Sequence, residues 1–139
     1  MSILRLFIVA LLVFSPLSVS HADELKNFLL KLTDAKNFPY QLLNEEYRAF
    51  FKVGENYLAV DKNQLKELYK EQNKIVETPE IKNFRILSRS DSNFFTAVTY
   101  EYNWSAKIGE TNMNGVVSAH SILQKTRTGW SVIFDAVTQ

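Results

Sequence analysis

The stretch Gly129–Gln139, GWSVIFDAVTQ, decides the fold more clearly than any other segment. A turn at 127–129 precedes it, and from Trp130 onward the period of the side chains is two, which is typical of a β-strand. Working back along the chain, we find the same period in 116–126, 94–107 and 84–89. These four segments predict a meander of antiparallel strands, and their lengths favour a strongly curved sheet.

The part of the chain before the meander predicts two helices and a hairpin. A stripe of apolar residues predicts the first helix over 23–32, and the pair Asp61 and Gln64 is a capping-box signal for a second helix that ends at Thr78-Pro79. Between these helices we expect a short helix or turn over 37–43. A hairpin of 47–53 and 57–60 follows, and we expect a loop over 109–115.

The first 22 residues have the pattern of a signal peptide. Arg5 precedes a short apolar run, and Ser20 and Ala22 supply small residues before a cleavage site. The run is too short for a membrane anchor, which needs about 20 apolar residues. We therefore expect an exported protein, periplasmic or secreted and free of the membrane after cleavage, with one domain over 23–139.

Composition excludes several classes of function. Without Arg5, 15 of the 16 basic residues remain against 15 acidic ones, so the mature chain lacks the basic excess that nucleic acids or anionic membranes attract. The chain has no cysteine, and His120 is the one histidine after residue 22. We expect no disulfide, no metal site and no cofactor.

The strand predicted over 94–107 has one face rich in aromatic side chains. We expect this face to be concave, and its tyrosine hydroxyls either find partners or line a wet pocket. The alternative is that these side chains pack in the core or in a dimer contact. The face consists of Phe94, Thr96, Val98, Tyr100, Tyr102, Trp104 and Ala106.

Two segments carry a resemblance to a known family. EEYRAFFKVGENYLAVDKNQLKELYKEQ (Glu45–Gln72) resembles the hairpin and helix of the nuclear transport factor 2-like superfamily, which includes SnoaL-like proteins and ketosteroid isomerases, and SAHSILQKTRTGWSVIFDAVTQ (Ser118–Gln139) resembles its final hairpin. The resemblance implies an α+β cone of the cystatin-like type, in which a curved, mainly antiparallel sheet wraps around helices. It also implies an apolar pocket inside the cone and a homodimer formed through the sheet.

The aromatic face of the strand, together with the resemblance, suggests which side chains line the pocket. Our candidates for ligand binding are Phe28, Tyr57, Tyr69, Tyr100, Tyr102, Trp104, His120 and Phe134, and our candidates for catalysis are His120, Tyr100 and Tyr102. SnoaL-like members often end the last strand with His-x-Ser, whereas this chain has Ala136-Val137-Thr138 there. This difference weakens the case for an enzyme.

The register of the final hairpin decides whether His120 could replace the missing histidine. If Thr126 faces Trp130, His120 lies opposite Ala136; if Arg127 faces Trp130, it does not. Two strand carboxylates, Glu101 and Asp135, could each serve as a general base if buried with a raised pKa.

These observations leave three hypotheses for function. The first is a non-catalytic module that binds a small apolar or aromatic molecule, or another protein. The second is a cofactor-free isomerase or dehydratase that uses a tyrosine and His120, or a buried carboxylate, in the pocket. The third is an adaptor that uses its curved sheet to bind a partner, most simply a second copy of itself.

Overall fold

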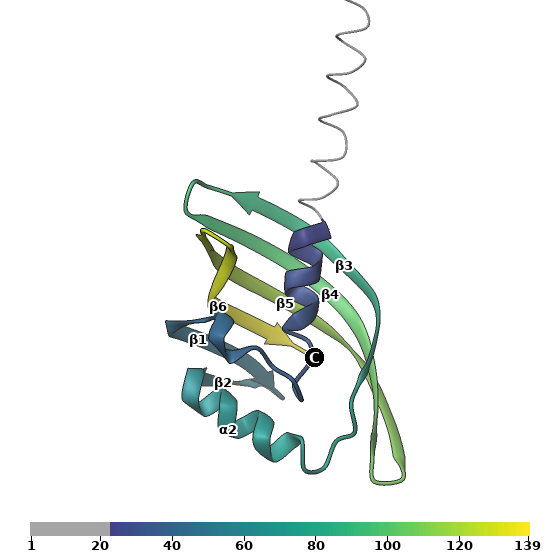
Figure 1. Cartoon of the computed structure of the whole chain (residues 1–139). Helices are drawn as coiled ribbons and strands as arrows, with labels where there is room; N and C mark the ends of the chain where they lie inside the picture. Colours follow the sequence, from purple (N-terminus) through teal and green to yellow (C-terminus); the bar gives the residue numbers. More distant parts are fainter. Residues whose placement is uncertain (1–22) are drawn as a thin grey trace, which may run out of the picture.

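A computed structural model describes residues 23–139. The predicted signal peptide lies outside the described residues. Figure 1 shows a strongly curved sheet whose concave side holds the N-terminal helix, with a second helix below it. No helix within 23–139 is long and apolar enough to cross a membrane.

The sheet has six strands in the order β2-β1-β6-β5-β4-β3. All neighbours are antiparallel except β1 and β6, which are parallel. The predicted hairpin and four-strand meander are both present, and the fold is α+β with an unclosed sheet. The strands are β1 (Leu43–Val53), β2 (Asn56–Asp61), β3 (Glu80–Asp91), β4 (Phe95–Ile108), β5 (Thr111–Thr126) and β6 (Gly129–Thr138).

The loop predicted over 109–115 was wrong. Ile108 pairs with Thr111, so β4 and β5 are joined by the two-residue turn Gly109-Glu110. Gly109 has a φ of 62°, a conformation that glycine adopts at little cost. The polar residues of 111–115 resemble a loop in sequence, but they pair with 104–108 and extend the hairpin of β4 and β5.

Both helices begin where the sequence predicted. Residues 23–31 form the first helix, and Tyr40–Leu42 forms a 3₁₀ turn (η1). Helix α2 (Lys62–Gln72) has the predicted capping box: the Asp61 carboxylate accepts from the Gln64 backbone N–H, and the Gln64 side chain accepts from the Asp61 N–H.

Helix α2 ends earlier than Thr78-Pro79, which corrects that prediction. Three turn residues, 73–75, follow the helix, and the first of them, Asn73, donates from its side chain to the carbonyl of Ala35. Ile75, in the turn after the helix, is 65% exposed. Val76 instead forms a bridge to Ile108 of β4.

One end of the cone is filled by side chains. Phe28 of the first helix packs against Trp130 of β6, with ring centroids 5.5 Å apart. The Trp130 indole donates to the hydroxyl of Thr96, which is fully buried. Leu123 and Val132 are also fully buried in the same core. The cavity that Tyr100 and Tyr102 line lies at the other end of the cone.

Candidate functional site

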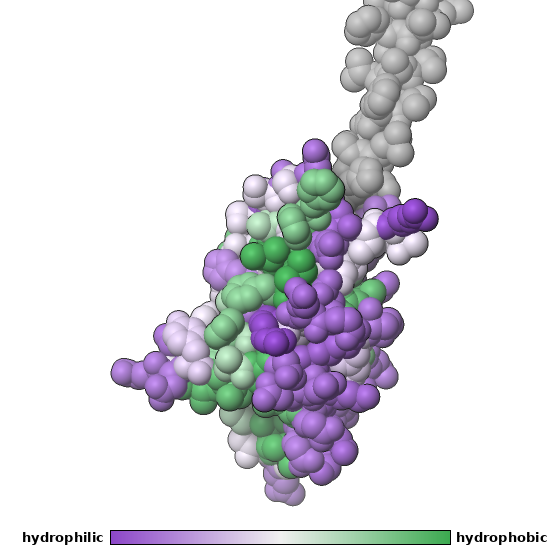
Figure 2. All heavy atoms as spheres, turned by 90° about the vertical axis from the view of Figure 1, so that its left-hand side faces the viewer, coloured by the Kyte–Doolittle hydropathy of each residue, from purple (hydrophilic) through white to green (hydrophobic). Residues whose placement is uncertain are grey.

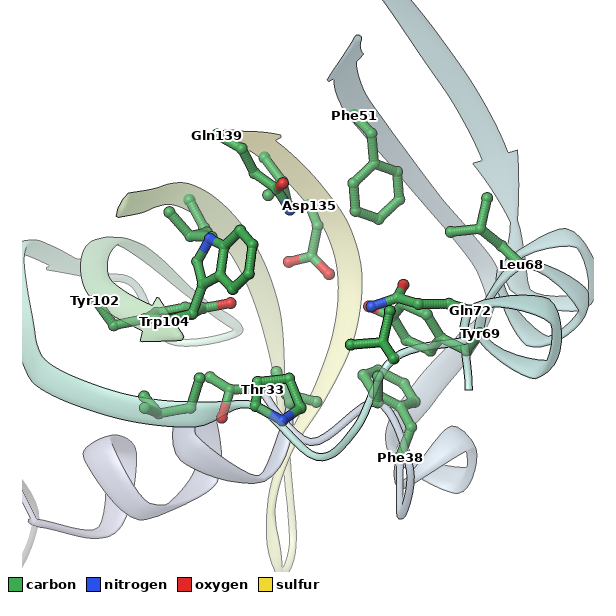
Figure 3. A pocket seen from close by; sticks show the side chains of 18 of the residues that line it. Thr33, Phe38, Phe51, Leu68, Tyr69, Gln72, Tyr102, Trp104, Asp135 and Gln139 are labelled. Atoms are coloured by element: carbon green, nitrogen blue, oxygen red, sulfur yellow. The ribbon is translucent and has the colours of Figure 1, made fainter. Parts of the chain in front are cut away.

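A cavity of about 350 Å³ lies between the concave face of the sheet, helix α2 and the segment after the first helix. Its volume falls within the range of pockets that hold small molecules. Figure 3 shows Trp104 and Tyr102 on one side, Phe51, Tyr69 and Gln72 on the other, and the Asp135 carboxyl group pointing into the space between them. The cone is thus neither empty nor completely packed.

Strand β4 supplies one aromatic wall. Alternation puts Tyr100, Tyr102 and Trp104 on the concave face, as the sequence predicted for this side of the strand. Tyr100 and Tyr102 stack on Phe84 of β3, with centroids 5.4 and 6.0 Å away. Tyr100 and Tyr102 therefore do both: each ring packs against Phe84, and each residue also lines the cavity.

Trp104 lies directly over Gly115 of the neighbouring strand. A Cβ atom at Gly115 would be 2.9 Å from the indole Nε1, so this position requires glycine for the ring to lie as it does. The Nε1 atom is buried and has no hydrogen-bond partner among residues 23–139.

A β-bulge between β5 and β6 places the acid in the cavity. Ile122 pairs with Phe134, but the next residue, Leu123, pairs with Val132, so Ile133 is extra. A bulge reverses the phase of alternation in a strand. Val132 therefore faces the core before the bulge, and Asp135 faces the same side after it.

Asp135 is held by two hydroxyl groups. Tyr47 of β1 donates to its Oδ2 over 2.8 Å, and Ser121 of β5 donates to its Oδ1. Burial raises the pKa of the Asp135 carboxyl, and the two hydrogen bonds lower it in part. Asp135 as a whole is 9% exposed, and its carboxyl group forms no ion pair within 23–139.

Four tyrosines surround this carboxyl group. Burial is the main cause that raises their pKa values, and the negative charge of Asp135 adds to the effect for each. The pKa of Tyr102 rises to about 12, those of Tyr47 and Tyr69 rise further, and that of Tyr100 rises well above its usual value. All four hydroxyls are therefore neutral hydrogen-bonding groups at physiological pH.

His120 lies on the convex face of the sheet, away from the cavity. It is exposed, and its Nδ1 lies 2.9 Å from the Thr99 hydroxyl. His120 does pair with Ala136, although Lys125, rather than Thr126 or Arg127, faces Trp130. Near the turn the register differs from both predicted ones, and the bulge shifts it by one residue so that His120 pairs with Ala136. His120 nevertheless faces away from the cavity.

The remaining candidates are distributed over three places. Tyr69, Tyr100, Tyr102 and Trp104 line the cavity, whereas Phe28 belongs to the packed end. Tyr57 is 63% exposed on β2. Phe134 lies on the convex face against Phe50, with centroids 5.7 Å apart.

Glu101, the other strand carboxylate, also lies outside the cavity. It pairs with Arg85 across β3 and β4, on the face opposite to Tyr100. Of the two strand carboxylates that the sequence offered as a general base, Asp135 is therefore the one that is buried. Within 23–139, no three His, Cys, Asp or Glu residues lie close enough together to hold a metal ion.

Sequence reasoning missed several residues that line the site. Phe38 follows the first helix, and Tyr47 and Phe51 lie on β1. The alternation of Tyr47, Ala49 and Phe51 was a signal that could have identified the inner face of β1. No such signal marks Asp135, because the bulge that turns it inward has no signature in the residue pattern.

Comparisons with known proteins agree on the fold. No family profile matches the sequence, and no curated protein matches it. Among solved structures, the chain is similar to a ketosteroid isomerase-like protein from Erwinia carotovora atroseptica, with a TM-score of 0.62 and 13% identity over 86% of this chain and 90% of that chain.

Two further structures are similar over a comparable length. A conserved protein from Planctomyces limnophilus has a TM-score of 0.65 and 16% identity over 85% of this chain and 96% of that chain. A nuclear transport factor 2-like protein with a cystatin-like fold from Novosphingobium aromaticivorans has a TM-score of 0.61 and 10% identity, over 91% of this chain and 86% of that chain. The chain therefore has the nuclear transport factor 2-like fold, and the predicted resemblance is confirmed at the level of the fold.

Proposed function

We propose that this chain is a binding protein for a small, largely apolar molecule, which occupies the cavity at the open end of the cone. The observation that carries the proposal is a single buried carboxyl group, Asp135, in a cavity with aromatic walls. Pockets for small molecules commonly combine an apolar lining with a few polar groups that orient the ligand.

Blocking the cavity tests this proposal. Leu68 of α2 lines the cavity and is 36% exposed, so Leu68→Trp can place a larger side chain there at little cost to the helix. Glu67→Trp is the matched control, because the Glu67 side chain is 68% exposed on the same helix.

The assay is the thermal shift of the protein across a panel of small aromatic and aliphatic compounds. We expect hits that stabilise the wild-type protein and Glu67→Trp but not Leu68→Trp. Absence of any hit, or hits that Leu68→Trp retains, would contradict the proposal.

A second function has one specific observation in its favour. The raised pKa of Asp135, caused by burial, suits a general base, and tyrosine hydroxyls of the same cavity could polarise a carbonyl oxygen. In this form the enzyme hypothesis uses Asp135, since His120 lies on the other face of the sheet. Exchange of the α-hydrogens of an apolar ketone in D₂O, measured by NMR and abolished in Asp135→Asn, would support it; unchanged exchange in that variant would exclude it.

We also propose that two copies associate through the convex face. Figure 2 shows a band of hydrophobic surface on the side of the molecule that carries β1 and β2 in Figure 1. On the convex face, Phe50 and Ile122 are 38% and 41% exposed, and Phe134 packs beside Phe50. Apolar side chains grouped on one face are typical of an interface between subunits.

Export remains a proposal that rests on the first 22 residues. Its test is the N-terminus of the protein recovered from an expressing bacterial cell. Cleavage after Ala22 would leave Asp23 as the first residue. A full-length chain that stays in the cytoplasm would refute it.

A further inference from the structure

The charges around the cavity are unbalanced. Among the described residues that line it, Asp135 and Lys52 are the two with charged side chains. Lys52 follows the inward-facing Phe51 on β1 and is exposed, so its ammonium group is solvated at the rim. Among the side chains of residues 23–139, the interior of the cavity therefore contains the Asp135 carboxyl group and no positive charge.

The Asp135 carboxylate can accept more hydrogen bonds than its two partners donate. A carboxylate offers about four lone-pair positions, and the hydroxyls of Tyr47 and Ser121 occupy two of them. Both partners are neutral. Burial of a carboxylate without a positive partner is unfavourable, so a cation that reached Asp135 would remove part of this cost.

The walls of the cavity are also suited to a cation. The rings of Tyr102 and Trp104 lie on one side of Asp135, and those of Tyr69 and Phe51 lie on the other (Figure 3). The faces of aromatic rings carry partial negative charge and attract ammonium groups. The same rings can stack on an apolar ligand body, so one ligand could use both properties.

We propose that the cavity selects organic monocations: protonated amines whose ammonium group donates hydrogen bonds to Asp135 and whose apolar body packs against Trp104 and Tyr102. This inference rests on the proposed binding function and names the class of ligand for that site. The amine must be monovalent and carry an apolar group, since the interior offers one carboxyl group and otherwise mainly apolar and neutral surface.

The test is a series of probes that differ in charge at nearly constant shape. 2-Phenylethylamine is the cation, 2-phenylethanol the neutral analogue and phenylacetate the anion. Binding is followed in ¹⁵N-labelled protein by NMR titration above pH 7, with the Trp104 indole N–H as the reporter inside the cavity.

We expect the amine to bind at least about tenfold more tightly than the alcohol, because charge-assisted hydrogen bonds are stronger than neutral ones, and we expect no binding of phenylacetate. Asp135→Asn should weaken amine binding by at least about tenfold and change alcohol binding by less than about twofold. Glu101→Gln is the matched control: it removes a negative charge from the convex face and should leave both affinities unchanged.

The outcomes separate this inference from the proposed function. Equal affinity for amine and alcohol, tighter binding of phenylacetate, or an equal loss in Glu101→Gln would overturn the cation inference while the binding function stands. Failure of all three probes to shift the Trp104 signal would overturn the cation inference, and only the absence of any hit in the thermal-shift panel as well would overturn the binding function. The wild-type charge series alone decides the point, even if Asp135→Asn does not fold.

Discussion

The hydrogen bond between Tyr47 and Asp135 gives the most quantitative prediction, for the substitution Tyr47→Phe. Tyr47 is 1% exposed, and its hydroxyl donates to Asp135 over 2.8 Å. The substitution removes one oxygen and keeps the ring. A hydrogen bond to a charged group contributes about 1.5–3 kcal/mol, whereas one between neutral groups contributes about 0.5–1.5 kcal/mol.

The cost should therefore depend on pH. Burial raises the pKa of Asp135, so the folded state holds a proton at pH values where the unfolded chain has released it. Asp135 thus lowers the stability of the native state as pH rises from the unfolded pKa through the folded pKa. Because Tyr47 stabilises the charged form, the loss of its hydroxyl should cost more above the folded pKa than below it.

Urea unfolding followed by circular dichroism, between about pH 4 and pH 8, measures this difference. With a slope of roughly 1.5 kcal/mol per M, a loss of about 2 kcal/mol lowers the midpoint by roughly 1.3 M at the alkaline end. Tyr102→Phe is the control, because it removes from the same cavity a hydroxyl that makes no hydrogen bond with another residue of 23–139.

A second acid, Asp91, also has a perturbed pKa, but it titrates below this pH range. Hydrogen bonding with Arg89 is the main cause that holds the pKa of Asp91 below its usual range, so its contribution to stability is present above the unfolded pKa and is lost as pH falls. This contribution is common to all three proteins and cancels in the comparison. A cost for Tyr47→Phe that is independent of pH, or equal to that of Tyr102→Phe, would refute the assignment of Tyr47 as a stabiliser of the ionised carboxyl group.

Three further predictions concern Trp104, the convex face and the capping box. Gly115→Ala should displace the Trp104 ring, cost about 1–3 kcal/mol and shift tryptophan emission in a Trp130→Phe background; unchanged emission would contradict the close contact. Ile122→Glu should convert a dimer to a monomer in sedimentation without loss of fold, whereas a monomeric wild-type protein would refute the proposed association. Asp61→Ala should reduce the free energy of unfolding in urea by about 1 kcal/mol, and no loss would show that the capping box contributes little to α2.

The sequence predicted the elements whose signals are local. The Asp61 capping box, the turn at Gly54 and the inward face of β4 each depend on neighbouring residues, and each is present in the structure. The helix end at Gln72 was missed; directly after it, Asn73 bonds to Ala35, a contact distant in sequence that a local pattern does not show. The strand over 111–115 was missed because its pairing with β4, rather than its own propensity, makes it extended.

The candidate site was predicted in part for the same reason. The aromatic wall follows from alternation along β4, so Tyr100, Tyr102 and Trp104 could be found without the structure. The acid could not be assigned, because its direction depends on how β6 pairs with β5. A strict period of two from Trp130 places Phe134 inside and Asp135 outside, and the structure has the reverse.

The bulge at Ile133 also explains why the cavity merits attention as a functional site. Without it, Phe134 would face the cavity, and burial of a phenylalanine side chain stabilises a protein by roughly 1.5–3 kcal/mol. With it, Phe134 lies on the convex face and a carboxyl group takes the interior position at a cost in desolvation. Packing alone therefore favours the opposite arrangement. Sites where a fold accepts such a cost are frequently the ones that bind or react, and the charge and shape of this site are what the amine, alcohol and acid probes measure.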